Sequence, residues 1–313
     1  MPRPRIIVCD LDGTLFHRES GVSAENLKAL RELGEAGVVR VIATGRSWKG
    51  SLVALPPDFP IDYLIFSCGA GCVDWRSSRL LLSKNLTARQ AHGAVRRLVA
   101  LDADFMVHAP IPEGHQFAFR ATGNVNPDFE RRLARHRANA RPWDERQPPA
   151  PASQLIAIDP LPRSETLWRT VRRSLPSLSV IRTTSPLDGE STWIEIFAPD
   201  VNKARAVAWL AERHSARRTE ILAIGNDFND LQMLRLAGRG FAIEGAPEEL
   251  LRAFPVVSLG NAIPSALSRW RRSGPVSASK TRRGKHRVAP SGGKTARPGR
   301  RRDRGKRARR SDR

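Results

Sequence analysis

The stretch Ile6-Ile7-Val8-Cys9-Asp10-Leu11-Asp12-Gly13-Thr14-Leu15 decides the fold of this chain. Four apolar residues lead directly into two carboxylates that are two positions apart. Such a run predicts a short strand buried on both faces, as in a parallel sheet, and Gly13 predicts the turn that ends it. Because ligands of open α/β sheets bind just beyond the carboxyl ends of the strands, we expect Asp10 and Asp12 to lie where chemistry takes place.

A second strand is predicted beside the first. Residues 23–34 have the N-cap and the apolar spacing of an amphipathic helix, and the apolar run 38–43 predicts the next strand. A strand–helix–strand unit favours a right-handed parallel crossover. Thr44-Gly45-Arg46, which follows the second strand, is therefore expected at the same sheet edge as Asp10.

The same sheet is predicted to take up further strands at 63–66 and, much later, at 220–224. A helix is predicted over 202–213, with Lys203 in its first turn. The late strand ends in Gly225-Asn226-Asp227-Phe228-Asn229-Asp230. Polar groups thus follow the ends of several elements of one predicted sheet.

Residues 82–190 have a different pattern of predicted strands and helices. Segments typical of strands and helices succeed one another without the regular alternation of a parallel sheet, and a Pro-rich link lies near 147–151. We therefore expect an inserted α+β domain at 82–190, with a core built from 1–81 and 191–270.

The net charge of +22 is concentrated at the end of the chain. Residues 271–313 hold 18 Lys and Arg and 2 Asp, and they contain no Leu, Ile, Met, Phe, Trp or Tyr. Such a segment cannot bury enough apolar surface to offset its ordering entropy, so a disordered basic tail is predicted. Nonspecific attachment of this tail to nucleic acid through phosphate neutralisation is one hypothesis, and a solvated extension without a partner is the other.

The polar groups of the core match the needs of phosphoryl transfer. A carboxylate can attack phosphorus, and a second carboxyl group can protonate the leaving oxygen and then activate water. Mg²⁺ with oxygen ligands can hold the nucleophile and the phosphate together. A hydroxyl group and a Lys charge can neutralise the phosphoryl oxygens.

Four segments, in order, resemble the signature motifs of the haloacid dehalogenase superfamily. They are Asp10-Leu11-Asp12-Gly13-Thr14-Leu15, Thr44-Gly45-Arg46, Asn202-Lys203, and Gly225-Asn226-Asp227-Phe228-Asn229-Asp230. The large insertion is similar to the cap of the Cof-like sugar-phosphate phosphatases. The resemblance covers about residues 5–268 and implies a doubly wound parallel sheet with an inserted α/β cap.

This resemblance also implies roles for individual residues. Asp10 would be the nucleophile and Asp12 the general acid and base, while Thr44 and Lys203 would bind the phosphoryl group. Gly45 and Arg46 are further substrate-binding candidates, and Arg46 either contacts the substrate phosphate or is a surface charge. The expected Mg²⁺ ligands are Asp10, Asp12 through its backbone carbonyl, Asn226, Asp227 and Asp230.

Two positions depart from the family pattern. Asn226 stands where the family usually has Asp, so that either its carbonyl or the adjacent Asp227 is expected to bind the metal. Cys68-Gly69-Ala70 replaces the usual Asn-Gly-Ala before the cap.

The sequence accordingly predicts a Mg²⁺-dependent phosphomonoester hydrolase of a small phosphorylated metabolite, with a sugar phosphate as the preferred substrate class. The alternative is a weakly active or non-catalytic relative whose basic tail binds nucleic acid; a phosphatase acting on a nucleotide or nucleic-acid end ranks lowest. Three cysteines indicate a reducing compartment, and no stretch approaches the roughly 20 apolar residues of a membrane span. A cytoplasmic protein without a membrane partner is expected.

Overall fold

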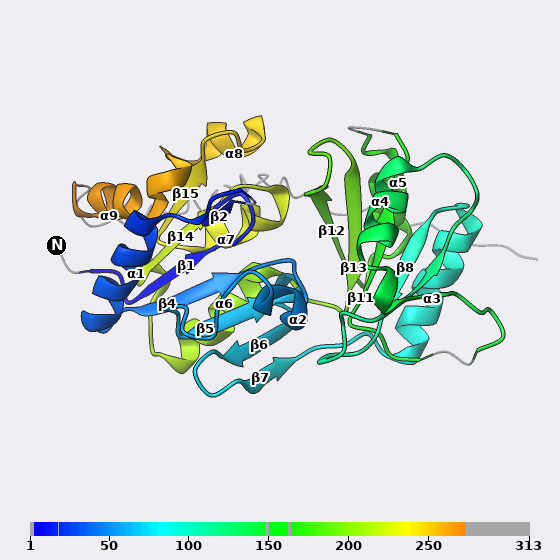
Figure 1. The fold of residues 1–313 in the computed structure, drawn as a ribbon, viewed down its shortest axis with the longest axis horizontal. Helices are drawn as coiled ribbons and strands as arrows, with labels where there is room; N and C mark the ends of the chain where they lie inside the picture. The colour runs from blue at the N-terminus through cyan, green and yellow to red at the C-terminus, as the bar shows by residue number, and fades with distance from the viewer. Residues whose placement is uncertain (1–2, 18, 148–149, 162–163, 273–313) are drawn as a thin grey trace, which may run out of the picture. The chain divides into compact units, whose positions relative to one another are not determined.

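A computed structural model describes residues 3–17, 19–147, 150–161 and 164–272 (Figure 1). Its first sheet has eight strands, six of which are consecutive parallel neighbours with β1 among them. In spatial order they are β16 (Val256–Val257), β15 (Arg239–Ile243), β14 (Ile221–Gly225), β1 (Ile6–Cys9), β4 (Val39–Ala43), β5 (Tyr63–Phe66), β6 (Gly71–Asp74) and β7 (Arg79–Ser83).

Strand β1 lies in the middle of this sheet, between β4 and β14, and both neighbours run parallel to it. Helix α1 (Ala24–Glu35) connects β1 to β4, and Ser23 caps its first turn by accepting a hydrogen bond from the backbone N–H of Asn26. The predicted crossover is confirmed, and the carboxyl ends of three neighbouring strands meet at one edge.

Helices cover both faces of the first sheet. Helices α1 and α9 (Ala262–Arg272) pack on the face that carries Ile7 and Cys9. The opposite face, which carries Ile6 and Val8, is covered by α6 (Lys203–Arg213), α7 (Leu231–Leu236) and α8 (Glu248–Ala253). The alternation of side chains along a strand explains this division, and the doubly wound architecture is confirmed.

The second sheet is formed by residues of the insertion and is mostly antiparallel. In spatial order its strands are β10 (Ala140–Pro142), β9 (Phe117–Arg120), β8 (Phe105–His108), β11 (Gln154–Ile158), β13 (Thr192–Phe197) and β12 (Ser179–Thr184). Helices α3 (Ala88–Ala100) and α5 (Thr166–Ser174) pack on one face, whereas α4 (Pro127–Arg135) packs on the other. We call this second sheet and its helices the cap.

The borders of the cap differ from the expected 82–190. Strand β7 continues to Ser83 within the first sheet, and β13 pairs with β11 and β12 of the cap. The chain therefore returns to the core after Phe197 rather than at residue 191. All six residues of β13 are buried, and such a run cannot be distinguished by its pattern from a strand of the core.

Smaller elements complete the described chain. They are β2 (Phe16–His17), β3 (Gly21–Val22), α2 (Trp48–Leu52) and the short 3-10 helices η1 (Ser67–Gly69), η2 (Arg137–Asn139), η3 (Arg218–Glu220), η4 (Phe228–Asp230) and η5 (Leu259–Asn261).

The predicted basic tail begins within α9, because Arg271 and Arg272 are its last residues. Residues 273–313 lie outside the described part of the chain. Among the residues that the structure describes, no helix has the length and apolar character needed to cross a membrane.

Candidate active site

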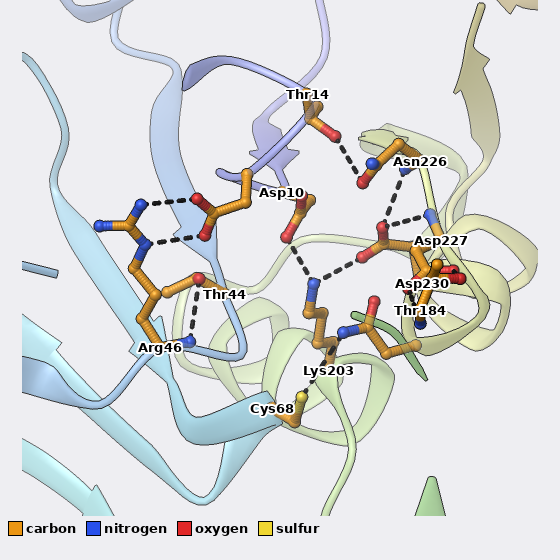
Figure 2. A network of polar contacts seen from close by, with 12 residues as sticks. Asp10, Thr14, Thr44, Arg46, Cys68, Thr184, Lys203, Asn226, Asp227 and Asp230 are labelled. Atoms are coloured by element: carbon orange, nitrogen blue, oxygen red, sulfur yellow. Dashed lines mark hydrogen bonds and ion pairs between the residues drawn. The ribbon is translucent and has the colours of Figure 1, made fainter. Parts of the chain in front are cut away.

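Polar side chains gather where β4, β1 and β14 end (Figure 2). Asp10 directly follows β1, Thr44 follows β4, and Asn226 follows β14. The parallel arrangement of the three strands brings these side chains to one edge. Asp10 and Thr44 are buried, at 5% and 1% exposure.

Lys203 joins this group from the first turn of α6. Its Nζ donates to Asp10 Oδ1 at 2.6 Å and to Asp230 Oδ1 at 2.7 Å, and its side chain has no exposed surface. The start of α6 is held by a close approach of Gly69, which has φ of +101°. A Cβ on Gly69 would lie 2.4 Å from the backbone oxygen of Asn202, so only glycine permits this packing.

The buried charges of Asp10, Lys203 and Asp230 shift the pKa values of one another. Burial raises the pKa of Asp10, and the Lys203 charge lowers it and partly offsets that shift. Burial lowers the pKa of Lys203, but Asp10 and Asp230 raise it more strongly, so its net pKa is above the usual range. Lys203 therefore remains an ammonium between two carboxylates, and removal of its charge would leave both carboxylates buried without a counter-ion.

The loop after β14 is shaped by Asp230. Its Oδ2 accepts hydrogen bonds from the backbone N–H groups of Asn226 at 2.9 Å and Asp227 at 3.1 Å. Its Oδ1 accepts from Lys203. Asp230 therefore positions the loop and Lys203 together, which differs from the metal-ligand role that the sequence predicts.

Asp227 turns away from Asp10 toward the cap. Its Oδ2 accepts from the Thr184 backbone N–H at 2.7 Å, and its Oδ1 accepts from Thr184 Oγ1 at 3.0 Å. Burial raises the pKa of Asp227 to about 6, while the Thr184 hydrogen bonds act in the opposite direction. The two carboxylate oxygens are thus engaged by Thr184 at the end of β12, so Asp227 links core and cap, and its role as a metal ligand stays a prediction.

The Asn226 carboxamide lies between Asp10, Asp12 and Thr14. One of its terminal atoms is 3.1 Å from Asp10 Oδ2, 3.2 Å from the backbone oxygen of Asp12 and 3.1 Å from Thr14 Oγ1. As the amide nitrogen, this atom would donate to all three oxygens. As the amide oxygen, it accepts from Thr14 and meets two further oxygens that have no proton to offer.

Without a cation, the orientation with the amide nitrogen toward these oxygens satisfies the hydrogen bonds. With its amide oxygen turned toward them, Asn226 would join Asp10 and the Asp12 carbonyl in offering three oxygens to a hard cation. Octahedral Mg²⁺ binds oxygens at 2.0–2.1 Å, which separates neighbouring ligands by about 3 Å, and the Asn226 distances match that spacing. Among the described residues no cluster of three or more His, Cys, Asp or Glu side chains is suited to a metal. The candidate set instead combines the Asp10 carboxylate, the Asp12 backbone carbonyl and the Asn226 amide.

Gly13 makes room for Asn226. Its φ is +71°, in the left-handed region, and a Cβ there would lie 2.5 Å from Asn226 Nδ2. The turn after β1 can therefore bring the Asp12 carbonyl close to Asn226 only with glycine at this position.

Arg46 binds Asp12 in a two-pronged ion pair. Its Nη2 donates to Asp12 Oδ1 at 2.6 Å and its Nε to Asp12 Oδ2 at 2.8 Å. The Thr44 hydroxyl accepts from the Arg46 backbone N–H at 3.1 Å. Arg46 was a candidate for substrate binding, and in this structure it holds the carboxylate of Asp12. Figure 2 shows Arg46 next to Thr44 at this edge.

The sequence-based prediction did not assign Glu195 or Asn229 to this site, and both contact Cys68. Cys68 Sγ donates to Glu195 Oε2 at 3.0 Å, and Asn229 Nδ2 lies 3.7 Å from the same sulfur. Glu195 comes from β13 of the cap and is 4% exposed. One signal could have pointed to it, because a single charged residue in the buried run Thr192–Phe197 is unusual without a partner.

A comparison with protein families identifies the core motifs. The model of a family described as haloacid dehalogenase-like hydrolase matches residues 7–267. The match spans both sheets and all the motif segments named above.

The sequences of individual relatives align with most of this chain. The chain is 26% identical to the 5-amino-6-(5-phospho-D-ribitylamino)uracil phosphatase YwtE of Bacillus subtilis, covering 82% of this chain and 93% of that protein. It is 24% identical to the pyridoxal phosphate phosphatase YbhA of Escherichia coli, covering 85% and 97%. A solved phosphatase of the haloalkanoate (HAD) superfamily from Bacteroides thetaiotaomicron shares the fold, with a TM-score of 0.67, 22% identity and coverage of 86% and 94%.

Proposed function

The chain belongs to the haloacid dehalogenase-like hydrolases, among the Cof-like phosphatases, and from this membership we propose that it hydrolyses small phosphorylated metabolites through a phospho-Asp10 intermediate. The observation that carries the proposal is the buried contact of Lys203 with Asp10 at the carboxyl end of β1. A carboxylate held there beside a fixed positive charge is suited to attack a phosphate ester.

Two chemical steps follow from this arrangement. In the first, an Asp10 oxygen forms a bond to phosphorus while the bond from phosphorus to the leaving oxygen breaks, and Asp12 supplies the proton to that oxygen. In the second, Asp12 takes a proton from water as the water attacks the phosphoryl group, which releases phosphate and restores Asp10. Arg46 holds both carboxylate oxygens of Asp12 in this structure, so Asp12 carries the proton of the first step only after at least one of its oxygens is released from Arg46.

The remaining residues of the site stabilise the negative charge of the phosphoryl group. Lys203 and the Thr44 hydroxyl face the phosphoryl oxygens in this proposal, with the backbone of Gly45 beside them. Asp10, the Asp12 carbonyl and Asn226 would hold Mg²⁺, which when bound supplies positive charge between the nucleophile and the phosphate. Relatives that act on two different phosphorylated small molecules support this substrate class, and sugar phosphates are the first candidates.

The test is hydrolysis of 4-nitrophenyl phosphate and a sugar-phosphate panel with MgCl₂ and with EDTA. Wild-type turnover should require the metal, and Asp10→Asn should lower kcat by at least about 10³-fold, as expected for loss of a nucleophile. The matched control is Asp58→Asn, an exposed site, which should keep wild-type kcat. Near-normal turnover in Asp10→Asn would defeat the proposal.

A second proposal concerns residues 273–313, which carry 16 Lys and Arg and 2 Asp. We propose that this segment attaches the enzyme to nucleic acid through phosphate contacts, with an affinity that falls steeply as salt rises. The full chain and a chain ending at Arg272 are compared for binding to duplex DNA at two salt concentrations. Equal binding by both chains would contradict the proposal.

A further inference from the structure

Glu195 is a carboxylate of the cap that reaches the catalytic edge of the core. It lies on β13, and its Oε2 accepts a hydrogen bond from Cys68 Sγ in the loop after β5 at 3.0 Å. The two residues are 127 positions apart in the chain. A charged side chain from the cap is thus fixed against the core of the site.

The position of Glu195 relative to the expected phosphoryl site is given by Gly45. A Cβ on Gly45 would lie 3.9 Å from Glu195 Oε1, 3.5 Å from Cys68 Sγ and 3.8 Å from Asn229 Nδ2. Glu195 therefore borders the backbone of Thr44-Gly45-Arg46. A carboxylate at this distance is close enough to contact a group attached to a phosphate bound at this backbone.

The Glu195 carboxylate has few donors for its charge. A carboxylate can accept about four hydrogen bonds. Among the described residues, the only hydrogen bond that the Glu195 carboxylate accepts comes from the Cys68 thiol. A thiol is a weak donor. Burial raises the pKa of Glu195, whereas the Cys68 hydrogen bond and the charges of Arg132 and Lys203 lower it. Arg132 itself lies over the Trp193 ring at 4.3 Å and donates to Met106 Sδ, so it offers charge rather than a hydrogen bond.

The backbone beside Glu195 is strained. Cys68 has φ of +50°, in the left-handed region, which is unfavourable for residues other than Gly, Asn and Asp. Its thiol nevertheless points at Glu195. Strain of this kind persists at sites where the surrounding structure holds a side chain for a purpose.

Other acceptors without donors lie on the same face of the cap sheet. Glu195 pairs in register with Ile156, and Gln154, two residues along β11, pairs with His108. Gln154 Oε1 and His108 Nε2 are buried and have no hydrogen-bond partner within the described residues. His108 Nδ1 lies 2.7 Å from the Gly114 carbonyl oxygen, so Nδ1 carries the proton and Nε2 is an acceptor.

A buried carboxylate with unused acceptor capacity is complementary to a ligand group that donates hydrogen bonds. We propose that Glu195 is the substrate-recognition residue of the cap: its carboxylate accepts hydrogen bonds from hydroxyl or amine groups of the leaving group. The enzyme then favours phosphate esters of polyols or amino alcohols, and it disfavours esters with a second anionic group near the phosphate. This inference rests on the proposed phosphatase function and specifies its substrate class.

The experiment compares kcat/KM for three esters in MgCl₂. Sorbitol 6-phosphate offers several hydroxyl donors, 4-nitrophenyl phosphate offers none in its leaving group, and 3-phosphoglycerate carries a carboxylate. In wild type, sorbitol 6-phosphate should exceed 3-phosphoglycerate by at least about tenfold, because an unpaired charge meets a buried like charge. Glu195→Gln should lower the sorbitol-to-aryl ratio at least about tenfold, the effect of losing one hydrogen bond to a charged group.

Matched variants separate recognition from support of the fold. Glu130→Gln makes the same change at an exposed site of α4 and should keep the wild-type ratio. An equal loss on all three esters in Glu195→Gln, or an unchanged ratio, would overturn the role of Glu195. Should that variant fail to fold, a wild type that hydrolyses 3-phosphoglycerate as well as sorbitol 6-phosphate would overturn it alone.

The result also distinguishes this inference from the proposed function. Absence of Mg²⁺-dependent turnover of every ester by wild type would remove the phosphatase assignment. Turnover with an unaltered ratio would remove only the recognition role of Glu195.

Discussion

Asp10 of the core and Glu195 of the cap are both buried carboxylates, but their surroundings differ. Asp10 has a fixed counter-ion in Lys203 at 2.6 Å, and Asp230 binds the same ammonium. Glu195 has one thiol donor and charges at longer range. The core therefore supplies its own complement of charge, whereas the cap keeps unused acceptor capacity.

This difference separates chemistry from selectivity. Groups whose partners all come from the core hold one geometry whatever the substrate carries beyond its phosphate. Groups with missing partners gain them only when a suitable leaving group is bound. Changes in the core should therefore alter every substrate alike, and changes in the cap should alter substrates unequally.

The largest expected effect tests the charge balance of the core. Lys203→Met should destabilise the protein by about 3–5 kcal/mol, because Asp10 and Asp230 would remain buried without their counter-ion. Urea unfolding gives the free energy, and kcat should fall on all esters. Lys28→Met, at an exposed position of α1, is the control. A loss below about 1 kcal/mol would mean that the core does not depend on this ion pair.

The cap should respond to acid through His108. Burial lowers the pKa of His108 from 6.5 to about 3, so the unfolded chain binds a proton that the folded protein does not. Stability is then present above pH 6.5 and is lost as pH falls toward 3. Between pH 6.5 and 4.5 the loss attributable to His108 should be about 2 kcal/mol.

The measurement is urea unfolding at pH 6.5 and 4.5. His108→Gln should lose less stability over this interval than wild type, while His92→Gln, at an exposed site, should follow wild type. Parallel pH dependence in all three proteins would contradict the prediction.

The adjacent residues Asn226 and Asp227 allow the core and the cap to be compared within one loop, because Asn226 faces Asp10 and Asp227 contacts the cap. Asn226→Ala should raise the Mg²⁺ concentration for half-maximal activity at least about tenfold, since even outer-shell partners of a metal contribute that much. The effect should be equal on all esters. An unchanged Mg²⁺ requirement would remove Asn226 from the candidate ligand set.

The smallest effect is expected for Asp227→Ala. It removes the acceptors of two Thr184 hydrogen bonds and should raise KM about fivefold, the order of one such bond. The Mg²⁺ requirement should stay within about twofold of wild type, because Asp227 faces the cap. A shift as large as that in Asn226→Ala would return Asp227 to the metal site.

The sequence predicted the core well because its signals are local. Apolar runs followed by polar residues locate Asp10, Thr44 and Asn226 at strand ends, and parallel neighbours then bring them together. The sequence could not tell which of the candidate residues after β14 binds the metal. The orientations of the Asp227 and Asp230 side chains depend on hydrogen bonds with Thr184 and Lys203, which lie outside this segment of the chain.

The contribution of the cap was not predictable in the same way. Strand β13 was assigned to the core because a buried strand has the same pattern in either sheet. The position of Glu195 against Cys68 depends on how the cap strand meets the loop after β5, which no local pattern encodes. Arg46 was only a candidate for substrate binding for a related reason, since its pairing with Asp12 joins residues 34 positions apart.

The central place of β1 has a consequence for biosynthesis. Its partner on one side, β4, follows within about 40 residues, but on the other side Ile6 pairs with Ile221. At roughly 5–20 residues per second, a ribosome needs about 10–40 seconds to reach that partner. During this time a fully apolar strand presents an open edge to other nascent chains. Truncated translation products should therefore aggregate, and Asp10 acquires its lysine counter-ion only after about two thirds of the chain, up to Lys203, has been synthesised.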